Sequence, residues 1–214
     1  MRIIFAVFPR LTALDAIGPY QVMEMLPGAE VAFAARTLDP VVDSAGWLTL
    51  VPAVTFDAVE SADVLVVPGG PGARSSVGDE ELLDWIRRIH GTTAWTTSVC
   101  TGSLLLGAAG LLRGLDATTH WSAVEPLEGY GARYTAERVV RQGRIVTAAG
   151  VSAGIDMALT LADIVAGRAV AEALQLMIEY DPQPPFDSGS VAKASPEARA
   201  YWADRLPAPA AVSQ

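Results

Sequence analysis

The sequence predicts a doubly wound α/β sandwich built around a mostly parallel sheet. Short runs of apolar and β-branched residues are continuous, as in strands that a parallel sheet buries on both faces. Helical stretches alternate with these runs, which is the pattern of repeated strand–helix units. With 214 residues, of which 51% are hydrophobic, the chain can bury one large core.

The individual elements follow from these patterns. We expect strands at residues 3–8, 31–35, 64–67 and 94–99, and helices at 16–26, 79–90 and 102–112. Asp79, Glu80 and Glu81 give the second helix the acidic first turn that the helix dipole favours. Farther along we expect a strand end at 118–120, a short helix at 122–127, a hairpin of 138–141 with 144–147, and helices at 153–165 and 169–180.

The domain organisation is simple, because no repeat or linker interrupts the chain. Residues 1–186 are expected to form one domain. The Pro-rich sequence from Asp181 is expected to end the regular structure. Residues 187–214 form an Ala/Pro-rich extension that we expect to be partly disordered.

Composition excludes several classes of function. A net charge of −9 argues against nucleic-acid binding, which needs a basic face. No apolar run approaches the roughly eighteen residues of a membrane span, and the first residues lack a signal-peptide cleavage site. The one cysteine rules out an internal disulfide. These features predict a cytoplasmic protein that binds neither nucleic acid nor membrane.

Three segments of chemical interest follow predicted strands, and parallel strands end at one edge of the sheet. The segments are 8–15, which ends in Asp15, the glycine-rich loop 68–72, and 100–102, which begins with Cys100. Cys100 lies between a strand and a helix, where the helix N-terminus favours a thiolate. A buried, inert cysteine is the alternative.

The other two segments also allow two interpretations. The backbone N–H groups of Gly70 and Thr101 could form an oxyanion hole, or the glycine loop could be only a tight turn. Asp15 could cap a helix N-terminus, or act as a general acid and base that shares a proton with Cys100.

Several motifs together resemble those of the ThiJ/PfpI superfamily, and within it the isocyanide hydratase branch. They are Leu-Asp-Ala-Ile-Gly-Pro at 14–19, Pro-Gly-Gly at 68–70, Ser-Val-Cys-Thr-Gly-Ser at 98–103, Ala-Thr-Thr-His-Trp at 117–121 and Ala-Gly-Ile-Asp at 153–156. The resemblance spans residues 2–186 with the motifs in order. It implies a flavodoxin-like fold, a homodimer, and a nucleophile on a strained turn.

Carried onto this chain, the resemblance implies a role for each motif residue. Cys100 would be the nucleophile and Asp15 its acid, while the amides of Gly70 and Thr101 would line the oxyanion pocket. The Thr101 hydroxyl would contact substrate or water. Ile17, Val151 and the partner subunit would set specificity. The implied reaction hydrates an isocyanide to a formamide through a thioimidate, with no metal or organic cofactor.

The chain departs from the protease-like members of the superfamily, which place His directly after the nucleophile. Thr101 stands there instead, so a Cys–His protease mechanism is poorly supported. His120 is expected to be structural, with a place in the crevice as the alternative. Two other functions stay open: a cysteine-based redox sensor and a glyoxalase-like activity. Sensor domains of AraC-type regulators share two of the motifs, but the Ala/Pro-rich C-terminal sequence of this chain does not resemble a helix-turn-helix.

Overall fold

A computed structural model describes residues 1–203 and residue 205. Its main sheet has seven strands in the order β10-β11-β7-β6-β1-β2-β5. The strands are β1 (Arg2–Ala6), β2 (Glu30–Ala35), β5 (Val54–Thr55), β6 (Val64–Val67), β7 (Trp95–Val99), β10 (Val139–Gln142) and β11 (Ile145–Ala148). All neighbours are parallel except β10 and β11, which form the predicted hairpin. The predicted fold class is confirmed.

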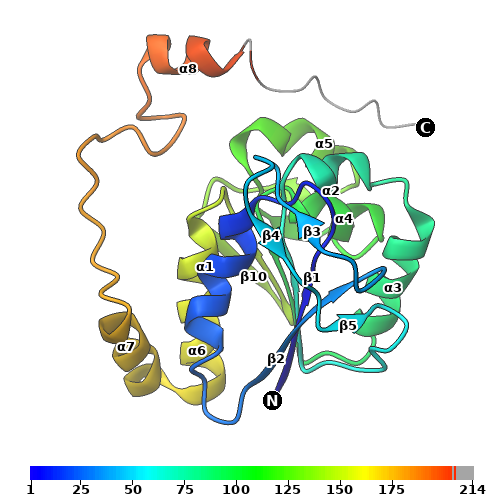
Figure 1. The fold of residues 1–214 in the computed structure, drawn as a ribbon. Coiled ribbons are helices and arrows are strands. Elements are labelled where there is room, and N and C mark those ends of the chain that lie inside the picture. The colour runs from blue at the N-terminus through cyan, green and yellow to red at the C-terminus, as the bar shows by residue number, and fades with distance from the viewer. Residues whose placement is uncertain (204, 206–214) are drawn as a thin grey trace.

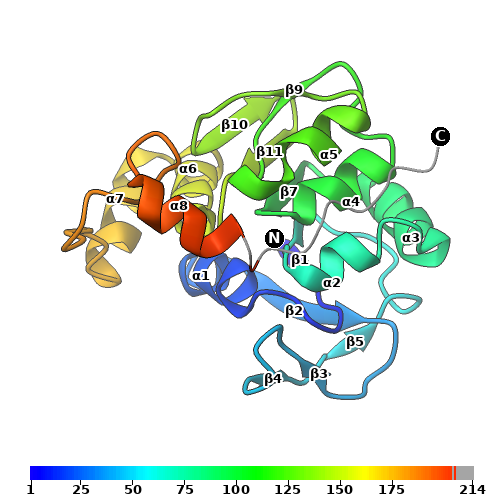
Figure 2. The same ribbon diagram turned by 90° about the horizontal axis from the view of Figure 1, so that it is seen from above.

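Helices cover both faces of this sheet (Figures 1 and 2). One face carries α1 (Ala13–Met23), α6 (Ala153–Ala166) and α7 (Arg168–Met177), and the other carries α3 (Glu80–His90), α4 (Gly102–Ala108) and α5 (Val124–Gly129). The short helix α2 (Pro71–Ser75) packs against α4. The central strands β1 and β6 are buried except for Arg2, which explains why their sequences read as continuously apolar.

Short elements complete the described fold. The strands β3 (Val41–Val42) and β4 (Thr49–Leu50) form a separate hairpin, and β8 (Asp116–Ala117) pairs with β9 (Arg133–Tyr134). The turn η1 (Trp121–Ala123) precedes α5, and α8 (Pro196–Ala203) follows a long irregular segment. No helix in residues 1–203 is both long and apolar enough to span a membrane.

Several predicted boundaries were wrong for physical reasons. Helix α1 begins three residues early because Thr12, and not Asp15, is its N-cap. Helix α4 ends at Ala108, just before Gly110 takes a positive φ of 81°. No strand forms at 118–120, since the Thr118 N–H donates to the Thr147 side chain instead of to a neighbouring strand.

The C-terminal prediction was also wrong in part. Regular structure does not end at Asp181, because α8 forms within the predicted extension. The expected disorder concerns residues 187–214, of which 204 and 206–214 lie outside the described residues. The described part of the segment from Asp181 is almost wholly exposed and passes from α7 toward α8 without packing on the sheet (Figure 1). The single-domain boundary at residue 186 therefore stays a prediction.

Candidate active site around Cys100

The three segments singled out in the sequence meet at one edge of the sheet. Strands β7, β6 and β1 are consecutive neighbours in it, and all three run in the same direction. Their carboxyl ends therefore bring together Cys100 after β7, the glycine loop after β6, and the segment after β1 that leads to Asp15. This is the edge where doubly wound sheets bind their ligands.

Cys100 lies on a strained turn between β7 and α4. Its φ is +57°, a left-handed conformation that costs a non-glycine residue free energy. Hydrogen bonds hold both of its backbone groups: the N–H donates to Ala149 O at 2.8 Å, and the carbonyl accepts from the Ser103 and Thr119 hydroxyls at 3.0 and 3.1 Å. These hydrogen bonds hold the strained backbone of the turn in place, and Cys100 on it is 4% exposed.

Asp15 is fully buried in the first turn of α1 and does not cap the helix. Its Oδ2 accepts from the Gly69 N–H at 2.9 Å, while Oδ1 has no hydrogen-bond partner among the described residues. Burial raises the pKa of Asp15 to about 7, against the opposing effects of the Gly69 N–H and the Cys100 side chain. The capping interpretation was wrong, and the carboxyl lies within reach of the thiol.

The thiol itself is held in its protonated form. Burial, and then the charge of Asp15, raise the pKa of Cys100 to about 12. The N–H groups of Val151 and Thr101 and the Thr101 side chain oppose this rise but do not cancel it. The expected effect of the helix N-terminus is therefore present but outweighed, so an attack by this sulfur would need a base. The role of Asp15 as that base stays a prediction.

The glycine loop is more than a tight turn, because its backbone lies very close to the backbone of Thr101. A Cβ on Gly69 would lie 2.5 Å from the Thr101 backbone nitrogen, so a side chain there would push the loop off Cys100. Gly70 has a φ of +122°, and its N–H donates to Thr101 Oγ1 at 2.8 Å. The same hydroxyl donates back to Gly70 O at 3.1 Å. The predicted oxyanion role of Gly70 would need this hydroxyl to move, and it stays a prediction.

The two expected specificity residues differ in their relation to the thiol. Val151 precedes α6 with a φ of +26°, and its N–H hydrogen bond lowers the pKa of Cys100. Ile17 is half-buried in α1, two residues beyond Asp15. Nothing in the described contacts joins Ile17 to Cys100, so its role stays a prediction.

Sequence reasoning missed a second polar group near Cys100. Arg74, in α2, donates from Nη2 to the Ser122 hydroxyl at 2.6 Å and to the Ser122 carbonyl at 3.3 Å. The Ser122 hydroxyl also contacts His120 Nδ1 at 2.7 Å. Burial and the charge of Arg74 lower the pKa of His120 to about 4, so the imidazole is neutral at pH 7. Only the placement of Arg74 one turn after the glycine loop could have drawn attention to it.

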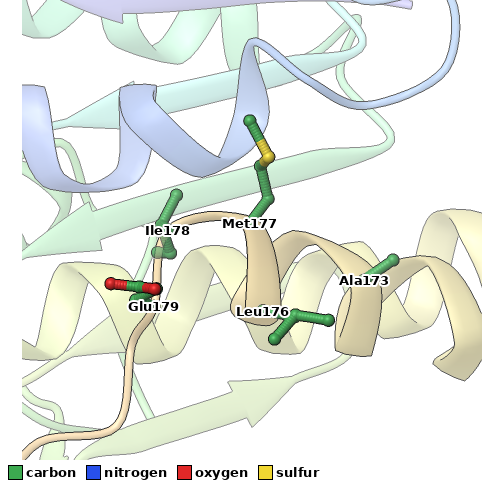
Figure 3. A pocket seen from close by; sticks show the side chains of 5 residues that line it. All are labelled: Ala173, Leu176, Met177, Ile178 and Glu179. Carbon is green, nitrogen blue, oxygen red and sulfur yellow. The ribbon is translucent and has the colours of Figure 1, made fainter.

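Two cavities lie elsewhere on the molecule. A hollow of about 420 Å³ on α7 is lined by Ala173, Leu176, Met177, Ile178 and Glu179 (Figure 3). A second cavity, of about 240 Å³, lies beyond β1 and β2 and includes Phe8, Arg36 and Asp79. Neither includes Cys100 or Asp15. Within the described residues no three His, Cys, Asp or Glu side chains gather as metal ligands, and the absence of a cofactor stays a prediction.

Comparison with known proteins gives this arrangement a context. The model of the DJ-1/PfpI family matches residues 1–164. A Pseudomonas putida protein named isonitrile hydratase is 47% identical over 190 residues, which cover 89% of this chain and 83% of the relative.

Solved structures agree with the sequence match. A crystal structure of a ThiJ/PfpI family protein from Pseudomonas syringae superposes with a TM-score of 0.91 at 41% identity, covering 95% of this chain and 84% of that one. Drosophila melanogaster DJ-1beta has the same fold, with a TM-score of 0.75 at 21% identity over 83% of this chain and 97% of that one. The chain therefore belongs to the DJ-1/PfpI family.

Proposed function

We propose that the protein is an isocyanide hydratase, a lyase that adds water to R–N≡C and releases the formamide R–NH–CHO. The observation that carries the proposal is the pairing of a buried thiol with a buried carboxyl in a chain so similar to isonitrile hydratase. An isocyanide carbon is a weak target for water but accepts a sulfur nucleophile, so covalent catalysis suits it.

The first half of the reaction forms a carbon–sulfur bond. The Asp15 carboxylate takes the thiol proton as the Cys100 sulfur attacks the isocyanide carbon. Asp15 then gives that proton to the same carbon, which yields the thioimidate S–CH=N–R. The charge of the pair is unchanged after this step, and no cofactor takes part.

The second half adds water and restores the thiol. Asp15 takes a proton from water while the hydroxyl adds to the thioimidate carbon, and the nitrogen receives the proton. The tetrahedral intermediate then expels sulfur, its hydroxyl proton returns to Cys100 through Asp15, and the formamide leaves. A pKa of about 7 suits a group that must both accept and donate a proton near neutral pH.

The protonated thiol argues against the alternative of a redox sensor. Peroxide oxidises thiolates, and sensor cysteines combine a low pKa with exposure. Cys100 has neither property, since it is 4% exposed and burial raises its pKa. No contact in the described residues favours a glyoxalase-like activity.

We also propose that the protein is a homodimer, as the family resemblance implies. Large apolar side chains are exposed on the β3–β4 hairpin, where Trp47 is 92% exposed, and on α8, where Trp202 is 52% exposed. A second copy of the chain would bury these apolar side chains in the dimer interface. Sedimentation of the full chain tests this: a dimer is expected, and a monomer at micromolar concentration would contradict it. The cytoplasmic location stays a prediction.

The experiment for the hydratase is a direct assay of formamide. Purified protein is mixed with a panel of alkyl and aryl isocyanides, and the products are identified by NMR and mass spectrometry. We expect formamides from the wild type and none above background from Cys100→Ala. No turnover anywhere in a broad panel would refute the proposed activity, while the fold and family would stand.

A further inference from the structure

Arg74 is a half-buried cation without a carboxylate partner among the described residues. Six other basic side chains make ion pairs there, at positions 36, 87, 133, 138, 168 and 193. Arg74 instead contacts neutral acceptors, the carbonyl and hydroxyl of Ser122. Because withdrawing a charge from water is unfavourable, such cations are usually paired. Arg88 and Arg144 also lack a carboxylate among the described residues, but both terminal nitrogens of each have hydrogen-bond partners, whereas in Arg74 only Nη2 does.

The guanidinium has donors to spare and a fixed position. All its hydrogen bonds in the described structure come from Nη2, which leaves Nη1 and Nε without partners. Ser122 holds Nη2 through two atoms, and His120 holds the Ser122 hydroxyl in turn. A planar guanidinium held in this way is suited to bidentate binding of a carboxylate.

Arg74 also belongs to the surroundings of the reacting thiol. Its helix, α2, has Gly70 as its N-cap, and the backbone of Gly70 exchanges hydrogen bonds with the Thr101 hydroxyl, one residue after Cys100. Its anchor Ser122 follows Thr119 and His120, and Thr119 holds the Cys100 carbonyl. The His120 ring packs on Gly150, where a Cβ would lie 2.9 Å from its Cδ2. Burial lowers the pKa of Arg74, and a negative charge on Cys100 would oppose this effect, so the two groups lie within electrostatic range of each other.

The neighbouring groups leave this positive charge uncancelled. His120 is neutral at pH 7. The Asp15 carboxyl accepts from the Gly69 N–H, and the described hydrogen bonds of Arg74 all go to Ser122. Among the described residues Arg74 is thus a cation without an ion pair, within electrostatic range of Cys100.

We propose that Arg74 binds an anionic group of the substrate, so that the preferred isocyanides carry a carboxylate a few bonds from the isocyanide carbon. This inference rests on the proposed function for the reaction, but the binding of the anion does not. Arg74 is then a specificity-determining residue, and it takes no part in bond making.

Isocyanoacetate and its methyl ester test this, because they differ in charge and otherwise only by one methyl group. We expect the wild type to have the higher kcat/KM for isocyanoacetate. In Arg74→Gln this value should fall by roughly tenfold to a hundredfold, mainly through KM, as expected for losing a charged hydrogen-bonded contact. The value for the ester should change less than about threefold, since neutral contacts are kept. Arg74→Lys should recover part of the loss.

Arg88→Gln is the matched control, because Arg88 is likewise held by backbone carbonyls, those of Val59 and Phe56, but on α3. It should leave both substrates unaffected. If Arg74→Gln lowered kcat/KM equally for both substrates, with unchanged thermal unfolding, the proposal would be overturned. Arg74 would then act through its electrostatic effect on Cys100.

A binding measurement separates this inference from the proposed reaction. N-formylglycine should bind the wild type more tightly than its methyl ester by calorimetry, and Arg74→Gln should lose that difference. If no isocyanide is hydrated but the difference in binding remains, the proposed function fails and the anion site stands. If the wild type binds both compounds equally, the anion site is refuted.

Discussion

Two charged residues neighbour Cys100, and the protein holds them in different ways. Asp15 is fully buried, receives one backbone N–H, and has a pKa raised to about 7 by its burial. Arg74 is half-buried, is held by a serine, and keeps donors free. The carboxyl can therefore exchange protons with the thiol, whereas the guanidinium offers a permanent charge. We therefore expect Asp15 to transfer protons and Arg74 to select the substrate.

The largest effect should come from removing the proton-transfer group. Asp15→Asn keeps an oxygen that can accept from Gly69 but loses the base, so kcat should fall by about 10² to 10⁴. Steady-state rates of formamide release measure this, and the exposed Asp57→Asn serves as control. Rates near those of the wild type would remove Asp15 from the mechanism.

The loop that positions Asp15 should tolerate no side chain. Gly70→Ala combines a φ of +122° with a Cβ 2.5 Å from the Thr12 nitrogen, so we expect it to lower the free energy of unfolding. A loss of about 3 kcal/mol is reasonable for such strain and should appear in chemical denaturation. Gly78→Ala has open space around its Cβ and should change stability little. Similar stability of the two variants would contradict the account of the loop.

The buried Asp15 carboxyl should also make stability depend on pH. The folded protein keeps this proton up to a pKa of about 7, while the unfolded chain loses it near 3.8. Between these values the unfolded state binds fewer protons, so this residue lowers stability as the pH rises. Asp15→Asn should remove this penalty, so its stability relative to the wild type should rise by about 4 kcal/mol between pH 4 and pH 8. Urea titrations across this pH range give the free energy of unfolding of both proteins. If the carboxyl were not desolvated, this free energy would depend on pH in the same way in the wild type and in Asp15→Asn.

A smaller effect is expected at Thr101. Its hydroxyl accepts a hydrogen bond from the Gly70 N–H and donates one to the Gly70 carbonyl, and it lowers the pKa of Cys100. Thr101→Val should reduce kcat/KM by about tenfold, which is the effect of one lost hydrogen bond. Thr101→Ser keeps the hydroxyl and should stay within about threefold. If the two variants behaved alike, the methyl group rather than the hydroxyl would matter.

The sequence predicted much of the proton-transfer side of the site. Cys100, Asp15 and Gly70 each come after a strand that the sequence predicted, and the parallel order of β7, β6 and β1 brings them together. The protonation state could not be predicted from the same pattern. The helix N-terminus near Cys100 favours a thiolate, but burial and the charge of Asp15 outweigh it, and burial depends on the whole packed fold.

The contact of Arg74 with Ser122 could not be predicted from the sequence. Arg74 meets Ser122 across 48 positions of sequence, and both residues are of types usually found on surfaces. The strands β3, β4 and β5 could not be predicted either, because each has only two residues, too few to show a hydrophobic periodicity. Motifs adjacent to long buried strands were found, and contacts between loops were missed.

In the proposed mechanism Cys100 attacks the isocyanide carbon while Asp15 takes its proton. Rapid acid quenching during turnover, followed by mass spectrometry, can detect the resulting adduct. We expect a protein species heavier by the mass of one isocyanide, located on the peptide that contains Cys100, formed during turnover and absent in Cys100→Ser. Continued turnover by Cys100→Ser at the wild-type rate, with no adduct in either protein, would contradict this mechanism.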